Sequence, residues 1–219
     1  MKLGLYLSSA DKLQRYLPFI PHLEGEILDV GGGVGNLYDL SGKKITVFDI
    51  NEDELEISRK KGLETIKGDG AKLPFKDNSF DTVISVATLE HIPKNNRSRF
   101  LEELKRVSKK KILLYTPYGN KGEEFDKKLY NFRKKIGRED KWTLEHIKNG
   151  LPSLEDIKES FPSAKIKKIQ NAQIWYFLMV LQSIPIINKV FPGIAYFALK
   201  PIQNREPTIG LLIFQEKFI

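Results

Sequence analysis

The sequence predicts a doubly wound α/β fold, in which helices cover both faces of a mainly parallel sheet. Three observations lead to this prediction. Apolar, β-branched runs alternate with helical patterns from residue 26 to residue 116. Three of these runs end on or beside an acid, namely Asp29, Asp49 and Asp69, and a glycine-rich segment follows the first run directly. Parallel strands bring such ends to one edge of the sheet, where α/β proteins bind ligands.

The glycine-rich segment has the pattern Asp29-x-Gly31-x-Gly33-x-Gly35. Glycine lacks a Cβ atom, so this turn can take positive φ and bring bare backbone against a ribose. The dinucleotide fingerprint is not matched, because its third glycine falls on Asn36. Taken alone, the segment is equally consistent with a flexible loop after a buried strand.

The next runs are expected to be strands at 44–49, 62–67 and 79–86. Asp49, at the end of the first of these, can accept hydrogen bonds from both hydroxyls of a ribose. The alternative is that Asp49 starts a turn with Asn51 and caps a helix. Asp69 can accept from an adenine amino group, or it is a turn residue between two glycines.

These segments, together with Phe80-Asp81-Thr82-Val83, Leu89-Glu90-His91-Ile92 and Leu104-Lys105-Arg106-Val107, occur in an order that resembles a known family. The family is the class I S-adenosylmethionine-dependent methyltransferases, type 11 group, which includes the ubiquinone and menaquinone biosynthetic enzymes. The resemblance implies a Rossmann-like seven-stranded sheet, mostly parallel, closed by an antiparallel hairpin of strands six and seven. It also implies S-adenosylmethionine as cofactor, held by Asp29, Gly31, Gly33, Gly35, Asp49, Ile50, Asp69, Gly70 and Val86.

Within this resemblance, the glycines would contact the methionine portion and ribose, Asp49 the ribose and Asp69 the adenine. The family usually has Lys-Pro-Gly-Gly before its fifth strand. Here 108–111 reads Ser-Lys-Lys-Lys, which we expect to form a tight, basic turn before a strand at 112–115. The resemblance fades after residue 118, where enzymes of this group carry the parts that select a substrate.

The sulfonium methyl of the cofactor is a strong electrophile, so the protein mainly has to align an acceptor with it. A base is required only for a hydroxyl or an activated carbon. His91, Tyr118 and His146 are the candidates, with Glu90 and Glu145 as weaker ones. His91 could instead be a structural histidine. We predict no metal site.

The chain has 219 residues and no cysteine. The length fits a single domain with substrate-side insertions at 118–152 and 171–207. The lack of cysteine excludes a thiolate zinc site, iron–sulfur radical chemistry and a cysteine nucleophile, and fits an intracellular chain. Residues 1–7 lack the long apolar core of a signal peptide, so we expect a cytoplasmic protein.

The formal charge of +8 comes from scattered lysines and arginines with a few local clusters. An amphipathic helix is expected over 123–136, with apolar residues spaced by three or four on one face and basic residues on the other. A helix pair is expected around 9–17, and antiparallel strands at 164–169 and 208–214.

The insertion at 171–207 is strongly apolar, and between 173 and 199 Lys189 is its only formal charge. Polar residues and prolines such as Pro185 divide it, so we do not expect a transmembrane helix. It either completes the core or a homodimer interface, or forms an apolar lid over a lipid-like acceptor that contacts an anionic membrane peripherally.

Three functions compete at this point. The first is methyl transfer to a small-molecule or lipid-linked acceptor. The second is an RNA methyltransferase, which the basic charge would assist. However, the motif Asp/Asn-Pro-Pro-aromatic of amino-directed nucleic-acid enzymes is replaced by Ser-Val-Ala-Thr at 85–88. We therefore do not expect nucleic acid as a partner. The third is a non-catalytic S-adenosylmethionine-binding protein.

Overall fold

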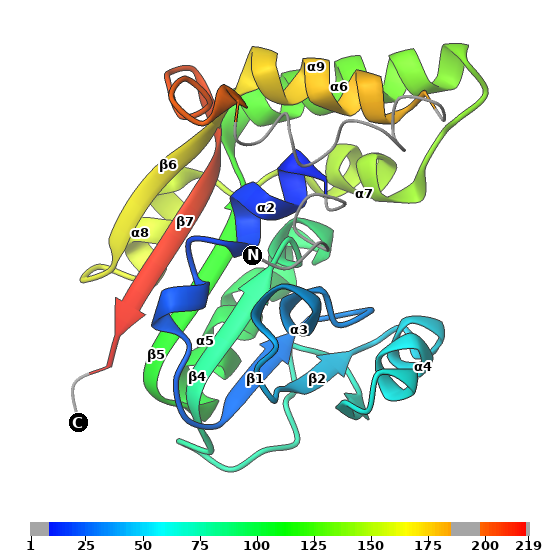
Figure 1. The fold of residues 1–219 in the computed structure, drawn as a ribbon. Coiled ribbons are helices and arrows are strands. Elements are labelled where there is room, and N and C mark those ends of the chain that lie inside the picture. The colour runs from blue at the N-terminus through cyan, green and yellow to red at the C-terminus, as the bar shows by residue number, and fades with distance from the viewer. Residues whose placement is uncertain (1–8, 185–197, 218–219) are drawn as a thin grey trace.

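The computed structural model describes residues 9–184 and 198–217, which contain one seven-stranded sheet in the order β3-β2-β1-β4-β5-β7-β6 (Figure 1). Strand β7 is antiparallel to both β5 and β6, and the other neighbouring pairs are parallel. This topology confirms the predicted doubly wound sheet with its terminal hairpin. The strands are β1 (Ile27–Val30), β2 (Thr46–Asp49), β3 (Glu64–Lys67), β4 (Phe80–Val86), β5 (Ser108–Pro117), β6 (Lys165–Asn171) and β7 (Thr208–Glu216).

Helices cover both faces of the sheet because side chains alternate along each strand and every strand has to bury two apolar surfaces. Leu28 faces a core cluster that includes residues of α5 and α8. Its neighbour Ile27 faces a second cluster that includes residues of α2, α3 and α4. The α-helices are α2 (Ala10–Tyr16), α3 (Asn36–Ser41), α4 (Glu52–Lys60), α5 (Arg97–Val107), α6 (Gly119–Lys135), α7 (Lys141–Asn149), α8 (Leu154–Ser160) and α9 (Ala172–Gln182).

Three short 3-10 turns complete the path: η1 (Ile20–His22), η2 (Leu89–His91) and η3 (Lys94–Asn96). Figure 1 shows that α6, α7 and α9 gather at the end of the sheet toward which β1 and β2 point. They come from the two segments that the sequence marks as insertions. The described helices of both segments thus lie over the carboxyl ends of the parallel strands.

The region around 108–111 differs from the prediction of a tight basic turn, because β5 already begins at Ser108. The pairing of β4 with β5 shifts register between Phe80 and Thr82, which accommodates the extra residues. The lysines find acidic partners: Lys110 Nζ lies 2.9 Å from Asp81 Oδ1 and Lys111 Nζ lies 3.1 Å from a Glu24 carboxylate oxygen. These ion pairs replace the solvated turn that the composition suggested.

Two helix predictions also need correction. The helix expected over 123–136 begins earlier, at Gly119, directly after β5. Instead of a helix pair around 9–17, the described residues from 9 onward form α2 followed by the turn η1. Residues 185–197, in the middle of the apolar insertion, lie outside the described residues. Among the helices described, none combines the length and the apolar character needed to cross a membrane.

Candidate active site

A cavity of about 1040 Å³ opens at the carboxyl ends of the central strands. One part of its wall is made by the glycine loop after β1 and by the ends of β2 and β3. The opposite part is made by η2 and by residues of α2, α6, α7 and α9. We call these parts the cofactor half and the acceptor half, because the first contains the predicted cofactor residues and the second the remaining site candidates.

The glycine loop has the backbone that its sequence predicts, with φ of 74° at Gly31 and 49° at Gly33. The amide of Gly31 donates to the carbonyl oxygen of Phe48 (2.7 Å), and that of Gly33 donates to Asp49 Oδ2 (2.9 Å). A Cβ atom at Gly33 would lie 2.2 Å from Glu54 Oε2. Gly31 and Gly33 line the cavity, and their backbone is open to a ligand.

Gly35 has a different role from the one predicted. It does not line the cavity, although its φ of 76° also requires glycine. A Cβ atom here would lie 2.7 Å from Leu63 Cδ1. Gly35 therefore lets the start of α3 pack closely against the segment that precedes β3.

Asp49 lines the cavity and accepts two backbone hydrogen bonds, from Gly33 and from the amide of Asn51 (2.9 Å to Oδ1). The cap of α4 is Asn51, whose side chain accepts from the amide of Asp53 (3.1 Å). The helix-cap alternative for Asp49 is therefore wrong, although its carboxylate does start the turn. Its position ties the end of β2 to the glycine loop.

Asp69 is a turn residue that also reaches the cavity. Its Oδ1 accepts from the amide of Ala71 (2.8 Å), as in a turn, and the residue also lines the cavity. Gly70 and Val86 line the cavity as predicted, as does Ile50, which is 69% exposed at the rim. Seven of the nine predicted cofactor residues thus share one surface.

Asp29 does not line the cavity; it lies fully buried beneath the glycine loop. Neither carboxylate oxygen finds a hydrogen-bond partner within the part of the chain that the structure describes. Burial, and then the nearby charge of Asp49, raise the pKa of Asp29 to about 7. A Cβ atom at Gly32 would lie 2.7 Å from its carboxyl carbon, so Asp29 supports the loop from below.

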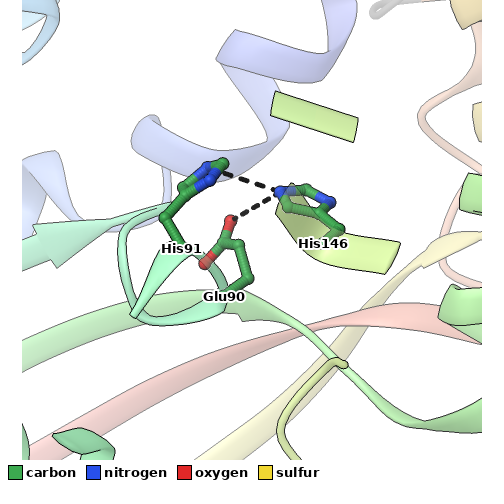
Figure 2. A group of neighbouring side chains, drawn as sticks. All are labelled: Glu90, His91 and His146. Atoms are coloured by element: carbon green, nitrogen blue, oxygen red, sulfur yellow. Dashed lines mark hydrogen bonds and ion pairs between the residues drawn. The ribbon is translucent and has the colours of Figure 1, made fainter. Parts of the chain in front are cut away.

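The acceptor half contains two histidines from distant parts of the chain (Figure 2). His91 belongs to η2 and His146 to α7, and their Nε2 atoms lie 3.4 Å apart. Glu90, also on η2, is buried and places Oε1 3.9 Å from His146 Nε2. Figure 2 shows the three side chains pointing toward one another.

Two further carboxylates hold the other nitrogens of these rings. Glu145 Oε2 lies 2.9 Å from His91 Nδ1, and Asp126 Oδ2, from α6, lies 3.0 Å from His146 Nδ1. Burial lowers the pKa of His91, so its ring is neutral at pH 7. Burial also acts to lower the pKa of His146, but the hydrogen bond to Asp126 and the charges of Glu90 and Asp126 outweigh it and raise that pKa.

Tyr118, the third catalytic candidate, lies elsewhere. Its hydroxyl pairs with Thr208 Oγ1 (3.0 Å), and the residue is not among those lining the cavity. Of the weaker candidates, both Glu90 and Glu145 line the cavity beside the histidines. We therefore set Tyr118 aside and keep the histidine cluster.

Sequence reasoning missed several lining residues, including Arg15 on α2, Glu54 on α4 and Asp126 on α6. Asp126 carried a detectable signal, because it occupies the buried stripe of an amphipathic helix next to Phe125 and three residues before Leu129. An acid on such a stripe is rare unless it is paired. The other two show no comparable pattern.

Comparison with known proteins agrees with this geometry. Residues 28–115 match the methyltransferase domain family. A fatty-acid O-methyltransferase of Mycolicibacterium smegmatis is 32% identical over 122 residues, covering 48% of this chain and 44% of that protein. A Homo sapiens protein named probable tRNA methyltransferase 9B is 35% identical over 83 residues, covering 37% of this chain and 18% of that protein.

A solved structure of a SAM-dependent methyltransferase from Thermotoga maritima shares the fold, with a TM-score of 0.61 and 21% identity. It covers 98% of this chain and 92% of that one. The resemblance is thereby confirmed over residues 28–115, which match the methyltransferase domain family, and the Thermotoga maritima structure shows the same fold. The chain spans about half or less of the curated relatives it matches, so the activity and acceptor of the whole protein are proposals.

Proposed function

We propose that this protein transfers the methyl group of S-adenosylmethionine to a small-molecule or lipid-like acceptor bound in the acceptor half. The observation that carries the proposal is the single cavity that contains the glycine loop, Asp49 and Asp69 at one side and the histidine cluster at the other. Its volume of about 1040 Å³ lies at the upper end of ordinary ligand pockets and leaves room for two bound molecules.

In the cofactor half, the backbone of Gly31 and Gly33 would lie against the methionine portion and ribose. Asp49 would accept from the ribose hydroxyls, which requires its carboxylate to share or exchange the hydrogen bond from Gly33. Asp69 would accept from the adenine amino group, and the exposed side chain of Ile50 would cover the base. All these groups line the cavity.

The acceptor half favours an amphiphilic acceptor. Trp175 and Met179 of α9, with Leu129 of α6, give it an apolar wall. The cation Lys141 lies at the same cavity and would meet an anionic group, whereas Arg133, which also lines it, is paired with Asp140. The name of one relative specifies a fatty acid, and those of two others a sterol and ubiquinone/menaquinone, which supports an acceptor of this kind.

The reaction is an in-line displacement. When bound, S-adenosylmethionine would supply the methyl group as an electrophile and would leave as its neutral thioether product. A lone pair on the acceptor forms the new bond, so the acceptor atom has to lie about 3 Å from the methyl carbon and in line with the sulfur. A hydroxyl acceptor also loses a proton, and His91 and His146 are the groups of this wall placed to orient it or take up that proton.

The test is a methyl-transfer assay with tritiated S-adenosylmethionine on separate lipid, RNA and protein fractions of a cell extract. We expect label in the lipid or small-molecule fraction. Label confined to RNA would overturn the acceptor assignment and support the alternative that the human tRNA methyltransferase relative suggests. Binding of the cofactor without transfer to any fraction would favour a non-catalytic protein.

Calorimetry supplies the control for this assay. The empty protein should bind S-adenosylmethionine and its demethylated product, and tight NAD binding without a response to either would contradict the proposal. The cytoplasmic location, the peripheral membrane contact and the homodimer stay predictions. A vesicle sedimentation assay tests the membrane contact, and a measurement of the molecular mass in solution tests the homodimer.

A further inference from the structure

The side chains of Glu90, His91 and His146 form a close cluster at the wall of the cavity. The Nε2 atoms of the two histidines face each other at 3.4 Å, and the Glu90 carboxylate lies 3.9 Å from one of them. One ligand-type atom from each residue lies within 4.8 Å of the other two. Figure 2 shows three acceptor-type groups converging on one point.

Their partners fix the tautomers of both rings. An ionised carboxylate only accepts hydrogen bonds, so each Nδ1 that faces a carboxylate carries the proton. Glu145 fulfils this role for His91 and Asp126 for His146. When both rings are neutral, both Nε2 atoms carry lone pairs that can bind a metal ion; without a metal, a proton on one of them makes the 3.4 Å contact a hydrogen bond.

This is the hydrogen-bond pattern of metal-binding histidines. Such residues almost always donate their second N–H to a carboxylate, a carbonyl or water, which orients the ring and makes the ligating nitrogen more basic. Here both rings have this support, from two different helices, α6 and α7. In a histidine pair with a purely structural role, a hydrogen bond from one ring to the other would be enough, without a carboxylate behind each ring.

The distances also suit an ion. In a tetrahedral zinc site with nitrogens at about 2.0–2.1 Å from the metal, two such nitrogens lie about 3.3–3.4 Å apart. The observed separation of the Nε2 atoms is 3.4 Å. The Glu90 oxygen lies 3.9 Å from His146 Nε2, so it would have to move closer by about half an ångström or more, through a rotation of its side chain.

The local charge favours a cation as well. Glu90, Asp126 and Glu145 bring three carboxylates to the two imidazoles. The nearby guanidinium of Arg15 is paired with Asp11, which offsets its charge. A dication would therefore replace like-charge repulsion with attraction at this point.

We propose that Glu90, His91 and His146 form a binding site for a divalent transition-metal ion of the zinc type. Two imidazoles and one carboxylate are a ligand set found in zinc enzymes, in which a fourth position stays open to water or substrate. All three residues line the cavity, so the open position faces the acceptor half. This site could not be predicted from local spacing, because His146 is 55 residues from His91 and follows no metal-binding pattern.

The ion would also define the acceptor more closely, a consequence that rests on the proposed methyl transfer. An acceptor oxygen in the open position would lose its proton more easily, because a bound dication stabilises the oxyanion. The two Nε2 atoms would then ligate the metal rather than take up the proton. The favoured acceptor is accordingly a hydroxyl or carboxyl compound that can bind a metal through oxygen.

The test measures metal binding without the reaction. Protein stripped with a chelator is titrated calorimetrically with zinc chloride, and separately with cobalt(II), whose visible absorption reports tetrahedral coordination. We expect one equivalent to bind. His91→Ala and His146→Ala should each weaken binding by more than about 100-fold, because loss of a ligand costs more than the 10–100-fold typical of a supporting partner. Glu145→Gln should fall in that lower range.

The third histidine of the chain provides the matched control. His22 lies on η1, packs against the ring of Phe214 and is remote from the cavity lining, so His22→Ala should leave the metal titration unchanged. Circular dichroism and calorimetry with S-adenosylmethionine check that each variant is folded. If a variant fails to fold, Glu90→Gln replaces it, because this change keeps the shape of the side chain.

The outcomes separate this proposal from the proposed function. No metal binding, or binding that His91→Ala and His146→Ala leave intact, overturns the metal site whatever the protein does with S-adenosylmethionine. A protein that binds zinc through this cluster but neither binds nor uses S-adenosylmethionine keeps the site and contradicts the methyltransferase proposal. Cobalt spectra without tetrahedral bands in a stoichiometric complex contradict the zinc-type geometry.

Discussion

The cofactor half of the cavity takes its main groups from one short stretch, 31–70, whereas the acceptor half gathers residues from Asp11 to Ile209. In the first, each group follows the end of a strand, and the parallel pairing of β1, β2 and β3 aligns these ends. In the second, groups from four helices and a 3-10 turn meet only after the chain has folded. The first half can therefore be found from local pattern, and the second cannot.

The largest expected effect tests the cofactor half. Gly33→Val places a branched side chain where φ is +49°. At this position even a Cβ atom alone would lie 2.2 Å from Glu54 Oε2. We expect S-adenosylmethionine binding to fall below detection by calorimetry. The matched control is Gly137→Val, at φ +66° with open space around it and outside the cavity, which should keep full affinity. Equal loss in both variants would mean that backbone strain, not the cofactor contact, causes the effect.

The next effect concerns Asp49→Ala. Hydrogen bonds that involve a charged group contribute about 1.5–3 kcal/mol, so S-adenosylmethionine affinity should fall by about 10- to 150-fold. The empty protein should lose about 1–2 kcal/mol of stability as well, because the amides of Gly33 and Asn51 lose their acceptor.

The control for this change is Asn51→Ala. It removes the cap of α4, for which about 1 kcal/mol of stability is typical, while leaving the cavity carboxylate in place. Calorimetry gives the affinities and thermal unfolding the stabilities. If Asn51→Ala weakened the cofactor as strongly as Asp49→Ala, the position of the turn rather than the carboxylate would determine binding.

A smaller effect tests the acceptor half through two residues of α9. Trp175 lines the cavity and donates from Nε1 to Asp11 Oδ1 (3.2 Å), whereas Phe177 is 57% exposed. Trp175→Ser should raise KM for the acceptor by about 10- to 100-fold, since burying an aromatic side chain contributes about 1.5–3 kcal/mol. Cofactor affinity should not change.

Phe177→Ser separates the wall of the cavity from the outer face of the same helix. It should leave KM unchanged and reduce any association with anionic vesicles. The double variant should spare cofactor binding, raise KM as Trp175→Ser does and reduce vesicle association as Phe177→Ser does. A double variant that is instead an active monomer, derived from a dimeric parent, would show that α9 forms an interface and would contradict the lipid-like acceptor.

The smallest effect on binding and turnover is expected at Asp29. Its carboxyl has a pKa of about 7 in the fold, against about 4 in the unfolded chain. The native state therefore binds the extra proton between these values, and stability decreases as the pH rises from about 4 to 7. Asp29→Asn removes this charge, so the difference in melting temperature between variant and parent should grow in favour of the variant over that range. A constant difference would show that the carboxyl is hydrated or paired.

The sequence predicted more of the fold than of the site. Strand ends, the glycine loop and the antiparallel hairpin could be predicted because they depend on periodicity and on the conformational freedom of glycine. The basic segment 108–111 was misread as a turn, because its lysines find partners only in the tertiary structure, at Glu24 and Asp81. Tyr118 was a catalytic candidate by position, but its hydroxyl pairs with Thr208, 90 residues away.

By itself, the sequence determined the class of the protein and seven cavity residues of the cofactor half, because neighbouring parallel strands turn local order into spatial order. Only the tertiary structure decided that Asp29 and Gly35 support the loop instead of lining the cavity. It alone brought Glu90, His91 and His146 together under the carboxylates of Asp126 and Glu145. The physical reason is that helix packing over long sequence separations, rather than any local pattern, places these side chains.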